Sequence, residues 1–341
     1  MTRFLKPFLL TITTLLLAQG ALAFEAGWRQ ISIAGPTPEA QATTVALYYP
    51  TQTPARAIPM GPFTPNVAVQ AAPEPVLKGL IVLSHGTGGS ELGHSTLAEG
   101  LAQAGYLVAA LRHPGDNWQD SSLRNSSPEI YFNQRPRQVS WVIDALLRDP
   151  EWKDRIAHDA RGPKVGAVGH SAGGYTVLAL AGAEPDMSRI ARHCNVERAE
   201  DPIFCRTGRI GQAIAQPSAP PSSNASLTDG RVRAVVALAP VGAVFDAQSL
   251  AKIRLPVAVY AAANDRWLVP RFHAQWIAQN LPRAELHRVP NAWHFAFMDT
   301  PSMPIATEDG DIRADPPGFD RSAFLKQLSS ALPAFFDKAF K

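Results

Sequence analysis

Three side chains that could together transfer an acyl group occur in the order Ser171, Asp265 and His294. A serine hydroxyl is a weak nucleophile at neutral pH, so it needs a histidine that accepts its proton. The histidine in turn needs a buried carboxylate, which fixes its tautomer and stabilises the imidazolium. Nucleophile, acid and base in this chain order are typical of sites in which the serine stands on a turn between a strand and a helix. The residues therefore predict nucleophilic attack on a carbonyl carbon.

The residues around Ser171 fit such a turn. An apolar strand is predicted to end at Val168, and the chain continues with GHSAG, a Gly-x-Ser-x-Gly pattern. A serine lifted onto a strained turn leaves no space for side chains two residues before and two residues after it. Glycine is therefore expected at Gly169 and Gly173 for a steric reason.

A second glycine-rich loop, with the sequence HGTGG, follows an apolar strand predicted over Gly79–Ser84. In hydrolases with this turn, the loop gives one backbone N–H to the oxyanion hole, and the residue after the nucleophile gives another. We therefore expect Thr87 and Ala172 to be the oxyanion donors. A phosphate-binding loop is the alternative, but the sequence has neither a Gly-Lys-Ser/Thr ending nor dinucleotide glycine spacing.

The carboxylate of the triad has two candidates. Asp265 follows the strand predicted over Pro256–Tyr260, whereas Asp246 follows the strand before it, from which some hydrolases take their acid. Because open α/β sheets place ligands at the carboxyl ends of their strands, both positions are suitable. We prefer Asp265 and keep Asp246 as the alternative.

The remaining histidines predict no metal site. They lack a compact ligand spacing such as His-Glu-x-x-His, and His170 occupies the variable position of the turn motif. No metal and no other cofactor is expected. The histidines concerned include His85, His94 and His113.

Short β-branched runs alternate with longer amphipathic stretches along the chain. Strands are predicted over Thr43–Tyr49, Gly79–Ser84, Tyr106–Leu111, Lys164–Val168, Val232–Leu238, Pro256–Tyr260 and Ala284–Val289. Helices are predicted over Ser95–Ala104, Arg135–Arg148, Ala172–Ala183, Arg271–Asn280 and Ser322–Ala339. Nearly continuous apolar strands between helices are typical of an α/β protein with a mostly parallel sheet and helices on both faces.

Two segments interrupt this alternation. Thr51–Pro75 is rich in proline and alanine, and we expect a surface excursion between the early strands. Residues from about Glu184 to Gly230 contain both cysteines and a stretch of linker composition. Because this segment follows the helix after Ser171, we interpret it as a cap or lid inserted into one domain that spans residues 24–341.

The first 23 residues have the pattern of a secretory signal peptide. Arg3 and Lys6 precede an apolar run from Phe8 to Leu17, and small residues then lead to a cleavage site after Ala23. A membrane anchor is the alternative, but the run is shorter than the ~20 residues that span a bilayer. The mature protein is expected to be periplasmic or secreted, without a stable membrane anchor.

Cys194 and Cys205 are the two cysteines of the chain, and they lie close together in sequence. In an oxidising compartment such a pair favours a disulfide. Two free thiols are the alternative, and a zinc site is less favoured because two cysteines and His193 fall short of a full ligand set.

The amino-acid composition indicates which classes of binding partner to expect. The chain has 341 residues, of which 46% are hydrophobic, so a large packed core is possible. Lys and Arg number 32 against 29 Asp and Glu, a balance of +3 that drops to +1 without the leader. Nothing in this balance favours nucleic acid. The residues predicted to attack a carbonyl carbon, rather than the composition, indicate a small-molecule ester as the partner.

The motifs LIVLSHGTGGSELGHS, VGHSAGGY, LPVAVYAAANDRWLVP and VPNAWHFAFMD resemble those of the α/β-hydrolase superfamily. More narrowly, the chain resembles the bacterial predicted dienelactone hydrolases, whose relatives include platelet-activating-factor acetylhydrolases. The resemblance extends from about Lys78 to the C-terminal helix. It implies the α/β-hydrolase fold and these site residues: Ser171, Asp265, His294, Thr87 and Ala172.

Two departures separate the chain from these relatives. Dienelactone hydrolases use a cysteine where this chain has Ser171, and the acetylhydrolases place their acid where it has Ala239-Pro240. The resemblance therefore implies a serine hydrolase of carboxylic esters without indicating which ester. A peptidase or amidase of the same fold, and an inactive secreted binding protein, are the alternatives.

Overall fold

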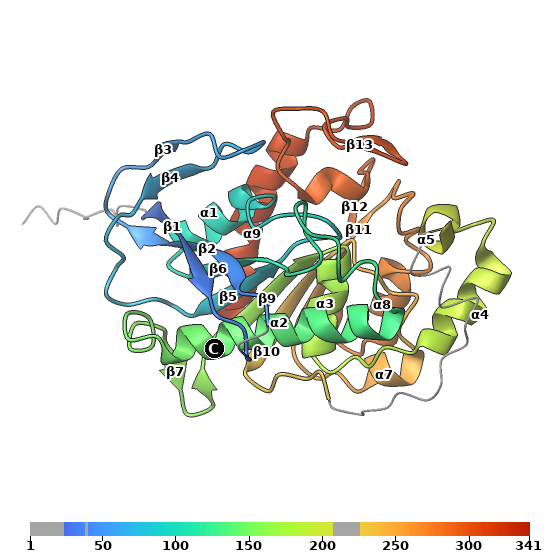
Figure 1. Ribbon diagram of the computed structural model, residues 1–341, viewed down its shortest axis with the longest axis horizontal. Helices are drawn as coiled ribbons and strands as arrows, with labels where there is room; N and C mark the ends of the chain where they lie inside the picture. The colour runs from blue at the N-terminus through green and yellow to red at the C-terminus, as the bar shows by residue number, and fades with distance from the viewer. Residues whose placement is uncertain (1–23, 38–39, 207–225) are drawn as a thin grey trace, which may run out of the picture.

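The computed structural model describes residues 24–37, 40–206 and 226–341. A ten-stranded sheet forms its centre (Figure 1). In spatial order its strands are β12 (Ala284–Val289), β11 (Val257–Ala262), β10 (Val232–Leu238), β9 (Val165–His170), β5 (Leu80–Ser84), β6 (Leu107–Arg112), β2 (Thr43–Thr51), β1 (Glu25–Ile33), β4 (Asn66–Val69) and β3 (Arg56–Ala57).

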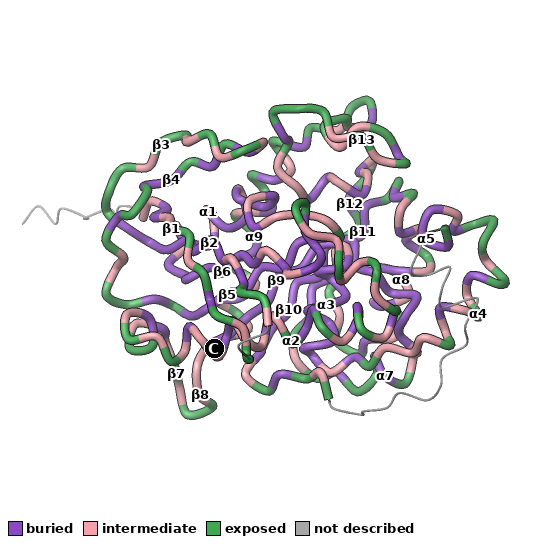
Figure 2. Tube along the Cα trace, in the orientation of Figure 1, coloured by how far each residue is buried: buried purple, intermediate pink, exposed green. Residues whose placement is uncertain are grey.

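The sheet is mostly parallel. Every neighbouring pair from β12 across to β6 is parallel, whereas β2 pairs antiparallel with both β6 and β1. All residues of β5 and β9 are buried, and Figure 2 shows the buried strands at the centre of the molecule. Two small hairpins lie outside the sheet: β7 (His158–Asp159) with β8 (Gly162–Pro163), and β13 (Ala306–Thr307) with β14 (Gly310–Asp311).

Helices cover both faces of the sheet, as the sequence predicted. The helices in the described part of the chain are α1 (Ser95–Gln103), α2 (Pro128–Arg148), α3 (Ala172–Leu180), α4 (Met187–Glu197), α5 (Pro202–Arg206), α7 (Ala247–Ala251), α8 (Ala274–Asn280), α9 (Arg321–Ala339) and the 3-10 helix η1 (His294–Phe297). Side chains of α2, α3 and α8 pack in one hydrophobic cluster, and those of α1 and α9 pack in another.

The strands divide their side chains between these two clusters. Along β5, Leu80 and Val82 belong to the cluster with α2 and α3, whereas Ile81 and Leu83 belong to the cluster with α1 and α9. This alternation follows from the two-residue period of a strand. Both faces of the sheet are therefore apolar, which explains why the strands appear in sequence as continuous hydrophobic runs.

The structure differs from the prediction at several elements. The sheet has an extra strand, β1, and the predicted excursion over Thr51–Pro75 contains β3 and β4, of which β4 pairs with β1. Helix α2 begins at Pro128 rather than at Arg135, because the Ser127 side chain caps it and proline suits its first turn.

The predicted signal peptide over residues 1–23 lies outside the described residues. None of the helices in the described part of the chain is long and apolar enough to cross a membrane.

Candidate active site

Ser171 stands on a sharp turn between β9 and α3. Its backbone has φ of +58° and ψ of −117°, a conformation with positive φ that is rare for residues with a side chain. Its N–H donates to the Leu238 carbonyl at 2.9 Å, and its own carbonyl accepts from the N–H of Val241 at 3.1 Å. These bonds to the end of β10 and to the loop after it hold the strained turn in place.

Glycine is required on both sides of this turn. A β-carbon on Gly169 would lie 2.1 Å from the Gly173 carbonyl oxygen, and one on Gly173 would lie 1.9 Å from the Ser84 carbonyl oxygen. The steric reason predicted for glycine at these positions is confirmed. A β-carbon on Gly86 would lie 3.1 Å from that of Ser171, so the HGTGG loop packs directly against the turn.

Asp265 and His294 form a buried pair. His294 Nδ1 donates to Asp265 Oδ2 at 2.7 Å, and both side chains are at most 3% exposed. The other carboxylate oxygen, Oδ1, accepts from the N–H groups of Trp267 at 2.9 Å and Leu268 at 2.8 Å. Because a carboxylate only accepts, the His294 proton resides on Nδ1 and Nε2 is the basic nitrogen.

Asp246, the alternative acid, has a different contact. It is the N-cap of α7, and its Oδ1 accepts from the N–H of Ser249 at 2.6 Å. Asp265 rather than Asp246 therefore has the contact with His294 that a triad acid needs.

His170 links the two parts of the candidate site. Its Nε2 donates to the His294 carbonyl at 2.9 Å, and the two ring centroids lie 4.9 Å apart. Burial, with the neighbouring His294, holds the pKa of His170 well below its ordinary 6.5, so the ring stays neutral. Because His170 precedes Ser171, it connects the loop of His294 to the turn at Ser171. The motif treats this position as variable, so sequence analysis gave it no role.

The glycine-rich loop after β5 is fixed by its own histidine. His85 Nδ1 donates to the Gly86 carbonyl at 2.6 Å, and His85 Nε2 accepts from the N–H of His113 at 3.1 Å. Burial and the nearby charge of Arg135 lower the pKa of His85 to about 3, so it remains in this neutral tautomer. The Gly86 carbonyl also accepts from the N–H of Gly89 at 3.2 Å. The sequence pattern predicts no role for His85.

The two predicted oxyanion donors are Ala172 and Thr87, which directly follow Ser171 and Gly86, the two residues in close contact. Ala172 is the first residue of α3, where a backbone N–H has no acceptor within the helix. Thr87 follows Gly86 in the loop that packs against Ser171. The fold thus brings both residues to the carboxyl ends of β5 and β9, the edge where open α/β sheets bind ligands.

Cys194 on α4 and Cys205 on α5 form a disulfide, as the sequence predicted. Both cysteines are buried, and with Ile190 and Phe204 they belong to the same hydrophobic cluster as α2 and α3. Figure 1 places α4 and α5 at one end of the molecule. Residues 207–225 of the predicted cap lie outside the described residues.

Two histidines and an aspartate meet beside this disulfide. The Nε2 atoms of His193 and His273 donate to Asp201 Oδ2 at 2.8 and 2.9 Å. The three residues could in principle hold a metal ion. A metal on Nε2 of a neutral imidazole requires a proton on Nδ1, yet His273 Nδ1 accepts from the N–H of Gly242 at 3.0 Å. The cluster is therefore a hydrogen-bonded latch between α4 and the segment before α8.

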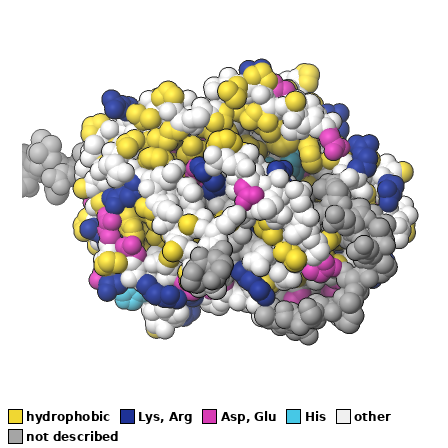
Figure 3. All heavy atoms as spheres, viewed as in Figure 1, with side chains coloured by type: hydrophobic (Ala, Val, Ile, Leu, Met, Phe, Trp, Pro, Cys, Tyr) yellow, Lys and Arg dark blue, Asp and Glu magenta, His cyan; other side chains and the backbone are white. Residues whose placement is uncertain are grey.

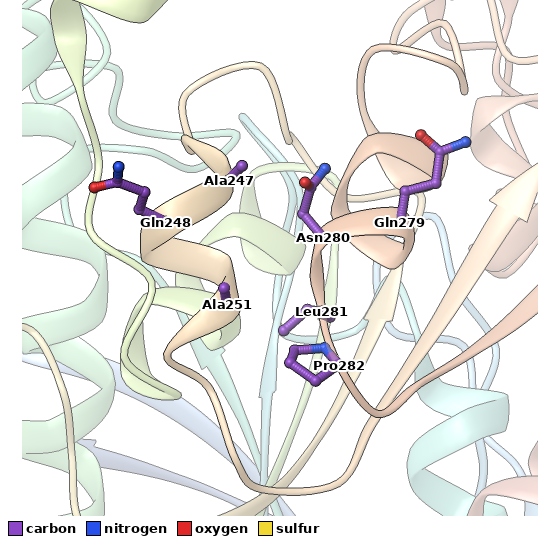
Figure 4. Close-up of a pocket in the computed structure, with 7 residues that line it drawn as sticks. All are labelled: Ala247, Gln248, Ala251, Gln279, Asn280, Leu281 and Pro282. Carbon is purple, nitrogen blue, oxygen red and sulfur yellow. The ribbon is translucent and has the colours of Figure 1, made fainter.

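One face of the molecule carries an apolar patch. Figure 3 shows hydrophobic side chains gathered along the upper part of this face, with a histidine visible in a recess at the right-hand edge of the patch. A separate groove of about 390 Å³ lies between α7 and α8 (Figure 4). None of the predicted site residues lines this groove.

Comparison with known proteins gives fold-level matches. No protein-family model and no curated protein matches the chain. Among solved structures, a ferulic acid esterase from Streptomyces cinnamoneus is 21% identical with a TM-score of 0.62, covering 94% of this chain and 92% of its own. A dienelactone hydrolase from Anabaena variabilis is 14% identical with a TM-score of 0.52, covering 93% and 100%. The chain has the α/β-hydrolase fold, as the sequence resemblance implied.

Proposed function

We propose that the protein is a serine hydrolase of carboxylic esters, with Ser171 as nucleophile, His294 as base and Asp265 as acid. One observation carries the proposal: a serine on a strained strand-to-helix turn is linked through His170 to a buried histidine–aspartate pair. The esterase and the dienelactone hydrolase among the structural neighbours favour an ester as the substrate.

In the first half-reaction, Ser171 Oγ attacks the ester carbonyl carbon and its proton moves to His294 Nε2. The carbonyl oxygen becomes an oxyanion, which the N–H groups of Thr87 and Ala172 stabilise. Asp265 keeps the Nδ1 proton of His294 in place and stabilises the imidazolium that forms. The bond from carbon to the alcohol oxygen then breaks, and the alcohol takes the proton from His294.

In the second half-reaction, water replaces the alcohol. His294 takes a proton from the water, which attacks the acyl carbon of the acyl-serine. The bond to Ser171 Oγ breaks, the serine recovers its proton from His294, and the carboxylic acid leaves. Every proton transfer uses His294, and no step needs a cofactor.

We also propose that the protein is exported and is periplasmic or secreted. The leader predicted over residues 1–23 supports export, and the disulfide between Cys194 and Cys205 suits an oxidising compartment. We assign residues from about 184 to 230 to a cap inserted in a domain that spans residues 24–341. The latch between His193, Asp201 and His273 supports a fixed position for its first part.

A fluorophosphonate probe tests the nucleophile. We expect the probe to label Ser171, and peptide mapping would locate the labelled residue. We also expect the protein to hydrolyse nitrophenyl esters, from acetate to palmitate, faster than the matching anilides. Ser171→Ala should remove labelling and lower turnover by roughly a million-fold. Ser330→Ala, an exposed change on α9, is the matched control. Labelling elsewhere, or turnover by Ser171→Ala within tenfold of the parent, would disprove the mechanism. Faster cleavage of the anilides would identify an amidase.

A further inference from the structure

Behind the HGTGG loop lies a buried polar cluster that the proposed reaction does not use directly. It consists of Asp116, Tyr131 and Arg135, none of which is more than 1% exposed. Burying an arginine and an aspartate carries a large desolvation penalty for each ion. Such groups persist only where hydrogen bonds satisfy them, so the positions of those bonds indicate what the cluster does.

Asp116 collects hydrogen bonds from the loop and from α2. One carboxylate oxygen accepts from Arg135 Nη1 and from the Tyr131 hydroxyl, the latter at 2.7 Å. The other oxygen accepts from the backbone N–H of Gly88 at 2.9 Å. Asp116 thus joins the helix directly to the loop in which Thr87 lies.

The direction of the hydrogen bonds extends this chain to Thr87. The Tyr131 hydroxyl has one proton, and it donates that proton to Asp116, which can only accept. The contact of 3.0 Å between Tyr131 Oη and Thr87 Oγ1 therefore has the threonine as donor. The side chain of the proposed oxyanion donor is fixed through Tyr131 to the buried carboxylate.

Arg135 fixes the backbone of the same loop. Its Nη2 donates to the His85 carbonyl, and the His85 ring in turn donates to the Gly86 carbonyl at 2.6 Å. In a planar trans peptide, the C=O and N–H groups point in opposite directions. Holding the Gly86 carbonyl toward His85 therefore determines where the Thr87 N–H points.

We infer that Asp116, Tyr131 and Arg135 are positioning residues, which aim the Thr87 N–H at the oxyanion of the ester reaction. The inference rests on the proposed function, because it presupposes that an oxyanion forms at Ser171. None of the three residues is proposed to touch the substrate. The charge around the cluster also has the helpful sign, since Arg135 and the neighbouring Arg124, whose Nε lies 3.5 Å from Asp116 Oδ1, carry two positive charges against one negative charge on Asp116.

Tyr131→Phe is the direct test, with Tyr106→Phe as its matched control. Both tyrosines are 1% exposed, and both hydroxyls donate to a carboxylate at 2.7 Å, but Tyr106 bonds to Asp337, away from the loop. We expect Tyr131→Phe to lower kcat about tenfold and to leave KM within twofold, because a misaimed donor weakens transition-state binding more than substrate binding. Tyr106→Phe should leave both constants within twofold. Equal kcat in the two variants would overturn the inference.

Thr87→Val gives a second test that does not depend on the folding of a core variant, because Thr87 is exposed. It removes the hydroxyl that contacts Tyr131 and should lower kcat by a similar factor. If both changes act through one hydrogen bond, the double variant should lose no more than either single variant. The inhibition constant of an alkyl boronic acid, which forms a tetrahedral adduct on the serine, should rise in parallel. If the kcat losses of the two single variants multiply in the double variant, the two residues do not act through one hydrogen bond and the inference is refuted.

Probe labelling separates the two proposals. A parent protein whose Ser171 reacts with the fluorophosphonate, but whose kcat is unaffected by Tyr131→Phe, would keep the proposed function and lose the positioning cluster. A parent protein whose Ser171 is neither labelled nor required for ester cleavage would lose both.

Discussion

Asp265→Asn tests the proposed acid by reversing the tautomer of His294. In the parent protein, Asp265 Oδ1 accepts from the backbone N–H groups of Trp267 and Leu268, while Oδ2 accepts from His294 Nδ1. An asparagine has only one carbonyl oxygen, and two backbone donors compete with one imidazole for it. The oxygen of Asn should face the backbone, because the reverse orientation would leave two N–H groups without an acceptor, at about 1–3 kcal/mol each.

With its oxygen turned to the backbone, the asparagine presents its NH₂ group to His294 Nδ1. The ring must then accept at Nδ1 and carry its proton on Nε2, where it cannot receive a proton from Ser171. We expect kcat to fall on the order of ten-thousand-fold, or about 5 kcal/mol in activation free energy, while KM changes little. Initial rates on nitrophenyl butyrate measure this loss, and the melting temperature should stay within a few degrees of the parent value.

Asp246→Asn is the matched control. Asn is as good an N-cap as Asp, so the first turn of α7 should be retained. Activity should remain within twofold of the parent. If Asp246→Asn abolished activity and Asp265→Asn did not, the acid would have to be reassigned and the tautomer argument would fail.

Three further predictions concern the scaffold. Gly173→Ala should abolish folding or activity, since its β-carbon would lie 1.9 Å from the Ser84 carbonyl oxygen, whereas Gly230→Ala, with open space around it, should change stability by less than about 0.5 kcal/mol in chemical denaturation. Joint replacement of Cys194 and Cys205 by serine should lower the free energy of unfolding by about 3 kcal/mol, as expected for a short closed loop. Ser171 should remain reactive to the fluorophosphonate in this variant. Two alkylatable thiols in the unreduced parent protein would show that the disulfide is absent. Burial raises the pKa of Asp299 from 3.8 to about 6, so the folded state binds the proton of this carboxyl more tightly than the unfolded state does. The free energy of unfolding should therefore fall as the pH rises from about 4 to 6. Asp299→Asn should remove that fall, and denaturant titrations at several pH values would measure it.

The parts of the site that sequence analysis predicted are those that depend on short stretches of chain. The Gly-x-Ser-x-Gly turn is local because the strain at Ser171 and the close approach of Gly169 to Gly173 arise within five residues. Asp265 and His294 lie 29 residues apart, but each follows a strand of the parallel sheet. Once the sheet is predicted, its carboxyl edge brings such positions together.

Elements at the margin of the sheet were harder to predict. Strand β1 is only half buried, and its sequence lacks the continuous apolar run of a central strand. The predicted cap segment includes a stretch of linker composition, whereas its residues Ile190 and Phe204 pack into the main cluster. Both outcomes depend on which surface a segment meets, and a single sequence does not specify that surface.

The positioning cluster illustrates a different obstacle, because one local signal for it was present in the sequence. Ser127 followed by Pro128 is a helix start, and a helix from Pro128 places Tyr131 and Arg135 four residues apart on one face. Starting the helix at Arg135 separated the two residues. Even with the correct start, arginine is rarely buried without a partner, so composition favours a solvated Arg135. Asp116, which reaches the same point from the loop after β6, provides the opposite charge that makes the burial of Arg135 possible. Clusters of this kind depend on three segments at once, which is why the Gly-x-Ser-x-Gly turn was predictable and the residues proposed to support the site were not.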